Sequence, residues 1–275
     1  MRHVLGLATG LALLLGDEPG RANPSRHDQV RIVYDRPKSA EALAIYRDLK
    51  GRRVLEGLRE IVGGVRLPRS LTLRFAACNG EANAWYAPEN RTVTLCYEYV
   101  RYVQDRAPKQ ASTAGIGRRD AVFGPLAQVF LHEAGHALFD LLDVPVLGRE
   151  EDAADQFAAH VLLELPPAQA RPIIDGIAHL YRSHAVEEEA EEAVLADDHS
   201  LALQRLYNLL CLAYGADRRA FGYLVAGGAL PQARAEQCGA EYDLATDSLR
   251  RLFRSHLRGG RLERARVRRA FRWMF

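Results

Sequence analysis

Residues 125–142 read PLAQVFLHEAGHALFDLL, and this stretch decides the fold. We predict that it forms one helix, because Pro125 suits a first helical turn and the sequence Asp-Val-Pro at 143–145 breaks the pattern after Leu142. Most of its residues are apolar, so the helix should lie in a water-poor part of the protein. Polar side chains on it therefore need partners.

The pattern His-Glu-x-x-His occupies positions 132 to 136 of this stretch. On a helix, the spacing i, i+4 places His132 and His136 on one face, where both imidazoles can bind a single metal ion. Glu133 then lies beside the open position of that metal. Two buried imidazoles without a partner would be costly, and their setting therefore favours a metal site.

A zinc site needs a third protein ligand, and a catalytic site leaves the fourth position to water. The acidic sequence EEDAAD at 150–155 begins the next predicted helix and supplies candidates. We favour Glu151, because Asp155 lies one turn later and could accept a hydrogen bond from a zinc-bound histidine. Glu150 and Asp152 remain alternatives. The cluster could also serve only to cap the helix N-terminus, but that interpretation leaves the histidines unexplained.

These motifs resemble the gluzincin metallopeptidases, in which a helix with the pattern His-Glu-x-x-His precedes a helix with a Glu ligand and an acidic residue four positions on. More closely, the chain resembles a bacterial family of metallopeptidases whose function is not established. The matching stretches cover most of residues 75–245 and are Cys78 with Asn83–Tyr86, Leu95–Glu98, His132–Asp140, Pro145–Ala159, and His199 through Gln204–Asn208 to Cys211 and Tyr214–Gly215. The resemblance implies a zinc ion and a thermolysin-like mechanism.

Under that mechanism Glu133 is the general base for a water held by zinc, and passes its proton to the leaving amine. The oxyanion then needs a hydrogen-bond donor, which gluzincins often take from a later helix. His199 is a candidate donor, since Asp197 and Asp198 precede it and could orient it. A helix cap is the alternative role for His199, and Tyr207 and Tyr181 are weaker candidates for the donor.

Strand patterns are confined to the first hundred residues. Alternation predicts strands at 29–34 and 71–75, and the segments 84–86 and 91–96 read as the arms of a hairpin. This hairpin comes just before the active-site helix, so its edge could bind substrate as an added strand. An ordinary hairpin pinned by a disulfide explains the same pattern.

Helical patterns fill the remainder of the chain. Besides helices at 40–62 and 125–142, we predict helices at 149–165, 169–182, 187–196, 199–214 and 231–244, with Gly215 as a helix stop. The expected fold is therefore α+β: a small N-terminal mixed sheet with a hairpin, followed by a mostly helical, zincin-like catalytic region.

The N-terminus has the zones of a secretory signal. A basic start at Arg2 precedes an apolar run from Val4 to Gly16 and a small residue at Ala22. We predict a signal peptide at residues 1–22 and an exported protein, periplasmic or secreted. About 13 apolar residues are too few for the alternative of a membrane anchor, which needs roughly 20.

Export would allow the four cysteines to form disulfides. Four cysteines allow three pairings. We favour Cys78 with Cys96 and Cys211 with Cys238, because the members of each pair are close in sequence. Four buried thiols are the alternative, and zinc binding by cysteine is disfavoured because the spacing Cys-x-x-Cys is absent.

Charge gives little evidence of a polyanionic partner for the whole chain. The formal net charge is +2, from 37 basic and 35 acidic residues, so no nucleic acid is expected. An acidic run at 187–192 is typical of a solvated surface. Residues 246–275 form an arginine-rich C-terminal tail after a metallopeptidase-like domain at 23–245. We expect a solvated tail, with weak membrane-surface contact as the alternative.

The leading hypothesis is an exported zinc-dependent metallopeptidase that acts on peptide or protein substrates. The first alternative is a proteolytically silent zinc-binding scaffold of the cell envelope, in which the metal only stabilises the fold. The second is a lipid or polyanion binder that acts through the arginine-rich tail. Neither alternative requires Glu133.

Overall fold

The computed structural model describes residues 29–109, 116–188, 195–259 and 264–275. Four strands form one sheet in the order β1-β2-β4-β3. Strands β1, β2 and β4 are parallel, and β3 pairs antiparallel with β4 at the edge. The strands are β1 (Val30–Tyr34), β2 (Leu71–Ala76), β3 (Ala84–Ala87) and β4 (Thr92–Cys96). The predicted hairpin is confirmed as β3 and β4.

Helices make up most of the remaining described chain. They are α2 (Ala40–Gly51), α3 (Val54–Val62), α4 (Tyr97–Arg106), α5 (Arg118–Leu142), α6 (Glu150–Leu163), α7 (Pro167–Glu187), α9 (Ala202–Ala216), α10 (Arg218–Phe221), α11 (Tyr223–Ala226), α12 (Gln232–Ala235), α13 (Cys238–Phe253) and α14 (Arg264–Ala270), followed by the 3-10 turn η1 (Arg272–Met274). This confirms the predicted α+β class, with a small mixed sheet before a mostly helical region.

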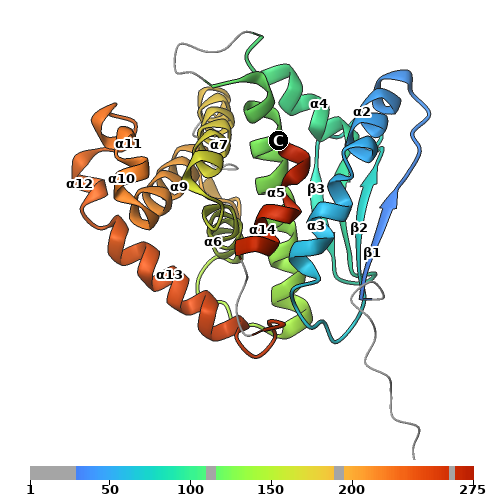
Figure 1. The fold of residues 1–275 in the computed structure, drawn as a ribbon. Helices are drawn as coiled ribbons and strands as arrows, with labels where there is room; N and C mark the ends of the chain where they lie inside the picture. Colours follow the sequence, from blue (N-terminus) through green and yellow to red (C-terminus); the bar gives the residue numbers. More distant parts are fainter. Residues whose placement is uncertain (1–28, 110–115, 189–194, 260–263) are drawn as a thin grey trace, which may run out of the picture.

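Helix α5 lies at the centre of the fold. It packs against β3 and β4 on one side and against α6 and α7 on the other, as Figure 1 shows. The helix begins at Arg118, so the prediction of a start at Pro125 was wrong. A proline inside a helix loses one backbone hydrogen bond. Here Pro125 and its neighbours are buried, and tertiary packing offsets that loss.

Other predicted helices also have different limits in the structure. The stretch 40–62 is divided into α2 and α3, because Arg53 has a left-handed backbone with φ 60°. The helix predicted from His199 begins at Ala202, and it does not stop at Gly215. Glycine has another role there, since a Cβ at this position would lie 2.2 Å from the carbonyl oxygen of Cys238. Gly215 thus allows α9 and α13 to approach closely. The helix predicted at 231–244 is divided into α12 and α13.

The C-terminal segment is part of the fold, so the expectation of a solvated tail was wrong. Residues up to Phe253 belong to α13, and α14 packs on α3. Phe271 is fully buried, and the ring of Trp273 lies edge-on against Phe123 at 5.6 Å. Apolar side chains among the arginines therefore fill the space between the end of the chain and helices α3 and α5.

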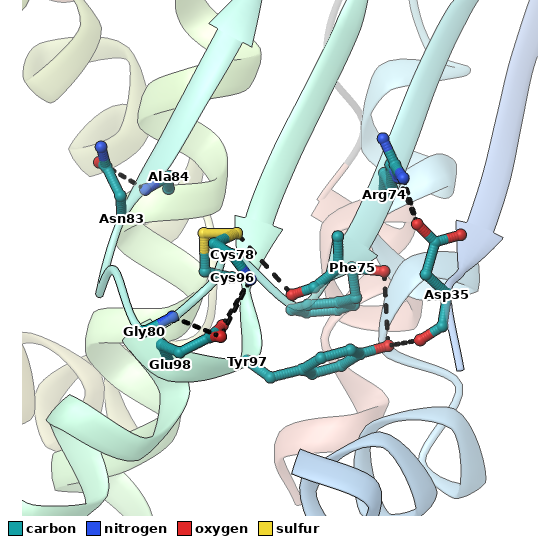
Figure 2. The surroundings of a disulfide bond; sticks show 11 residues. Asp35, Arg74, Phe75, Cys78, Gly80, Asn83, Ala84, Cys96, Tyr97 and Glu98 are labelled. Carbon is teal, nitrogen blue, oxygen red and sulfur yellow. Dashed lines mark hydrogen bonds and ion pairs between the residues drawn. A yellow bond between two sulfur atoms is a disulfide. The ribbon is translucent and has the colours of Figure 1, made fainter. Parts of the chain in front are cut away.

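The structure contains both favoured disulfides, Cys78–Cys96 and Cys211–Cys238. Figure 2 shows the first of them at the end of β4. Beside it the Glu98 carboxylate accepts hydrogen bonds from the backbone amides of Cys78 and Gly80. This disulfide holds the loop that leads into β3.

Some predicted features fall on residues outside those described. The signal segment at 1–22 is one, and 189–194, most of the helix predicted at 187–196 and of the acidic run, is another. In the described ranges, no helix combines the length and the apolar character that membrane crossing requires.

Candidate metal centre

The centre is built where α5 and α6 cross. Gly135 lies between the two histidines, and a Cβ there would be 3.3 Å from the Phe157 ring and 3.4 Å from the backbone of Ala154. Because the distance between packed helices depends on the side chains at the contact, a glycine opposite an alanine lets the two helices come close. The acidic first turn of α6 is thereby brought against the histidine face of α5.

Three of the predicted residues meet at this crossing. Nε2 of His132 lies 3.2 Å from Nε2 of His136. The Glu151 carboxylate is 2.9 Å from the first nitrogen and 3.3 Å from the second. The ligand atoms of these three side chains all lie within 4.8 Å of one another, close enough to hold one metal ion.

The hydrogen bonds of the two Nδ1 atoms, the outer nitrogens, determine which tautomer each imidazole adopts. They therefore determine whether the two Nε2 atoms, the inner nitrogens, can bind a metal ion. Nδ1 of His132 is 2.8 Å from Asp155, and Nδ1 of His136 is 2.7 Å from Glu150. A carboxylate only accepts hydrogen bonds, so both Nδ1 atoms carry hydrogen. In neutral imidazoles the two Nε2 atoms then present lone pairs to each other and to Glu151. Such an arrangement requires a cation between them, either a proton or a metal ion.

The donor set fits zinc. Two nitrogens bound tetrahedrally to one zinc ion at about 2.05 Å are separated by about 3.3 Å, close to the 3.2 Å between the two Nε2 atoms. Two histidines and a glutamate are a ligand set of catalytic zinc sites. Each histidine also donates its outer N–H to a carboxylate, the arrangement that orients zinc-bound histidines.

Asp155 is itself held by two further side chains. Arg205 on α9 donates to both of its oxygens, at 2.7 and 2.8 Å, and Gln128 donates at 2.9 Å. Burial opposes ionisation of Asp155, but Arg205 and His132 outweigh it and hold the pKa of this carboxyl below its usual range. The carboxylate therefore stays ionised and fixes the orientation of His132.

The charges of the centre favour a cation. Burial would raise the pKa of Glu151, but hydrogen bonds from His132, His136 and His199 lower it. Burial likewise opposes protonation of His136, yet the hydrogen bonds to Glu151 and Glu150 raise the pKa of His136 to about 9. The centre without metal thus holds protons where a metal ion would supply the positive charge.

Glu133 is buried, with 8% of its surface exposed, and no other acidic residue of the described ranges is buried to this extent. Burial raises the pKa of its carboxyl, although the neighbouring histidines oppose this, and the Tyr86 backbone forms a hydrogen bond to it. A raised pKa brings a carboxylate closer to the range in which it can take up and release a proton at neutral pH. Glu133 therefore has the environment of a general base.

The structure brings His199 to the same centre. Its Nε2 lies 2.9 Å from Glu151, and its Nδ1 lies 3.1 Å from Asp197 and 3.2 Å from Asp198. The hydrogen bond to Glu151 raises the pKa of His199 to about 9. His199 precedes α9 rather than forming part of it, and its ring remains about half exposed. In a protonated His199 both N–H groups thus donate to carboxylates, and the Nε2–H lies beside Glu151 in the wall of the cleft.

The alternative candidates have other contacts. Asp152 accepts a hydrogen bond from Ser200, and Glu150 faces the outer nitrogen of His136. Tyr181 is buried and borders the cleft, whereas Tyr207 lies on another part of the surface, in a separate hollow. Of the acidic candidates, Glu151 is the one that faces both inner nitrogens.

A cavity of about 440 Å³ opens over the centre. One wall is β3, which contributes Ala84, Trp85 and Tyr86, and Tyr86 is tied to α5 by a 2.6 Å hydrogen bond to Asp140. The opposite wall comes from α7 and from Arg205. The edge strand therefore runs along the cleft that contains Glu133.

Sequence reasoning gave no role to Arg205 or Gln128. Gln128 is buried within the apolar part of α5, and Arg205 is a cation on α9, directly before the buried Leu206. A charged residue in such a setting nearly always has a partner. The sequence could therefore have indicated that Arg205 has a partner, but it does not identify Asp155 as that partner.

One comparison with known proteins gives a match. The profile of the family DUF4344, which is described as "Putative metallopeptidase", matches residues 34–253. No curated protein and no solved structure matches the chain. The matched region contains β2, β3, β4, the last residue of β1 and every residue of the centre described above. The chain belongs to this family of metallopeptidases.

Proposed function

We propose that this protein is an exported zinc-dependent peptidase in which His132, His136 and Glu151 hold the metal. Glu133 is the general base, and His199 donates a hydrogen bond to the oxyanion. Asp155 orients His132. The family supports peptide hydrolysis, and the arrangement of side chains supports the metal and the roles.

One observation carries the proposal. The inner nitrogens of His132 and His136 and the carboxylate of Glu151 converge on one point, while the outer nitrogens are bound to Asp155 and Glu150. If the carboxylates only capped a helix and the histidines had no shared ligand, two Nε2 lone pairs that face each other would repel. A shared cation explains this arrangement, and the residue types favour zinc.

Zinc, when bound, lowers the pKa of a coordinated water to about 7 and polarises the carbonyl of the scissile bond. The residues supply the remaining steps. The Glu133 carboxylate takes a proton from the attacking water and passes it to the leaving amine. The His199 imidazolium is held through Nδ1 by Asp197 and Asp198. Once Glu151 binds the metal, the Nε2–H that faces Glu151 is released and donates to the oxygen that becomes negative. Arg205 keeps Asp155 ionised throughout.

The edge strand β3 is the proposed support for the substrate. It is the last strand of the sheet and lines the cleft, and Trp85 is 40% exposed there. An extended peptide can add to such an edge through main-chain hydrogen bonds. That binding mode places a peptide bond near Glu133 without requiring particular side chains.

Export is part of the proposal. The two disulfides are typical of oxidising compartments, and the predicted signal segment at 1–22 gives a route to them. We expect the mature protein in the periplasm or outside the cell. N-terminal sequencing of the protein recovered from the periplasm and the medium tests this, and a mature chain that still carries residues 1–22 would contradict it.

Cleavage of an unfolded protein substrate tests the catalytic proposal. We expect the zinc-loaded wild type to cleave a denatured casein and the Glu133→Gln variant to be inactive while it retains zinc. Glu236→Gln is a matched control, because Glu236 is an exposed carboxylate at the end of α12. Zinc without any cleavage by the wild type would instead support the silent scaffold. Equal cleavage by wild type and Glu133→Gln would refute the assigned base.

A further inference from the structure

A second, larger cavity lies away from the candidate metal centre. Its volume is about 890 Å³, and its wall comes from α3, α5, α6, α13 and the start of α14. None of its lining residues belongs to the cleft around Glu133. We call it the C-terminal cavity. Volumes of about 300 to 1,000 Å³ are usual for sites that bind small molecules.

The inner wall of this cavity is apolar. It is formed by buried side chains from four separated parts of the chain, namely Ile61, Val65, Leu138, Phe157, Val161 and Phe253. Leu249 and Leu257 continue this wall toward the surface, where both are partly exposed. Burial lowers the pKa of His160 in the same wall, so its ring is neutral at neutral pH. An apolar chain would be well accommodated there.

The outer part of the cavity is cationic. Four arginines line it, Arg250, Arg251, Arg254 and Arg264, against a single acidic residue, Glu164. Arg264 pairs with Glu164 at 2.9 Å, and Arg251 pairs with Asp247 at 3.3 Å. Within the described ranges, Arg250 and Arg254 form no ion pair with a carboxylate. Two guanidinium groups therefore remain available to an anion.

We propose that the C-terminal cavity binds one molecule with a single long acyl chain and an anionic head group, such as a long-chain fatty acid. The chain lies against the apolar inner wall, and Arg250 and Arg254 bind the carboxylate. The combination of a deep apolar wall with a cationic mouth carries the assignment, because neither a peptide backbone nor a small inorganic anion matches both. The site is independent of the metal and of peptide cleavage.

Displacement of a fluorescent fatty acid tests the proposal. The full chain is expressed, stripped of lipid on a hydrophobic resin, and titrated with cis-parinaric acid. We expect saturable binding of one molecule per chain and displacement by oleate. Oleyl alcohol, which lacks the charge, and octanoate, which lacks the long chain, should each displace at least tenfold less well. A lysophospholipid with a phosphate head group is titrated in the same way. This tests whether the site distinguishes a phosphate head group from a carboxylate.

Matched variants locate the binding. Arg250→Glu/Arg254→Glu should weaken binding at least tenfold, while Arg268→Glu/Arg269→Glu, with the same charge change on exposed α14 residues outside the cavity, should change it less than twofold. Ala265→Trp, which adds a large side chain at the cavity wall, should abolish binding. Circular dichroism and the urea midpoint show that each variant is folded.

Three outcomes would overturn the proposal. The first is no saturable binding by the wild type, as expected if the chain itself fills the cavity. The second is an equal loss in both arginine pairs, which would indicate attraction to the whole basic surface. The third is binding to anionic vesicles that Ala265→Trp leaves unchanged, with no binding of dispersed fatty acid. That last result would assign this face to a membrane surface rather than to a single lipid.

Discussion

Replacing Arg205 by methionine tests how the candidate metal centre is supported. The guanidinium and Asp155 are each about one fifth exposed and are joined by two hydrogen bonds, so the variant leaves a largely buried carboxylate without its cation. Removing one partner of a buried ion pair costs about 3 to 5 kcal/mol. His132 and Gln128 still bind Asp155, so we expect the lower end, a loss of about 3 kcal/mol.

The lowered pKa of Asp155 determines how the free energy of unfolding depends on pH. The ion pair lowers the pKa of Asp155 in the folded protein, so it stabilises the fold above the unfolded pKa of about 3.9, and this stabilisation is lost as the pH falls. In Arg205→Met the unpaired carboxyl instead takes up a proton readily at low pH. The difference in the free energy of unfolding between wild type and variant should therefore persist from pH 7 down to about pH 4 and shrink below about pH 4, where the wild type loses the ion pair.

Urea unfolding in the presence of a chelator measures this difference without contributions from metal. The double variant Asp155→Asn/Arg205→Met is the control, because it removes both charges and should be less destabilised than Arg205→Met alone. In zinc titrations, Arg205→Met should bind the metal about 10- to 100-fold more weakly, since Asp155 no longer fixes His132 firmly. A loss of less than about 1 kcal/mol at pH 7, or a loss that stays unchanged below about pH 4, would refute this reasoning.

Two further predictions concern the C-terminal segment and the protons of the metal centre. Trp273→Ala should reduce the free energy of unfolding by about 3 to 5 kcal/mol, because the side chain is 6% exposed and packs on Phe123; an unchanged urea midpoint would mean that the segment does not contribute to stability. Zinc affinity should rise about tenfold per pH unit for each proton released between pH 7 and pH 9, because the pKa of His136 is raised to about 9 and a ligand must lose its proton to bind. Calorimetry in buffers of different ionisation enthalpy measures the released protons, and a count of zero at pH 7 would contradict the ion pairs described here.

The sequence predicted most reliably the features that follow a local, periodic pattern of residues. The spacing of His132 and His136 predicts one face of a helix, and the strand and hairpin patterns before residue 100 agree with the sheet. Both disulfide pairings were predicted, because the members of each pair are close in sequence and lie in one compact local unit. These features are local, so neighbouring residues suffice to specify them.

Long-range packing decided what the sequence did not predict. The start of α5 before Pro125, the passage of α9 through Gly215 and the docking of Trp273 each depend on a surface that comes from another part of the chain. The pairing of Arg205 with Asp155 joins residues 50 positions apart. Helix propensity and charge runs describe each segment alone and therefore cannot supply such contacts.

The metal content of the purified protein tests the central claim most directly. Mass spectrometry of the wild type, of Glu151→Gln and of Asp152→Asn measures zinc per chain after dialysis. We predict about one zinc in the wild type and in Asp152→Asn, whose carboxylate binds Ser200, and almost none in Glu151→Gln. A wild type without bound metal, or a Glu151→Gln variant that keeps its full zinc content, would contradict the proposed centre.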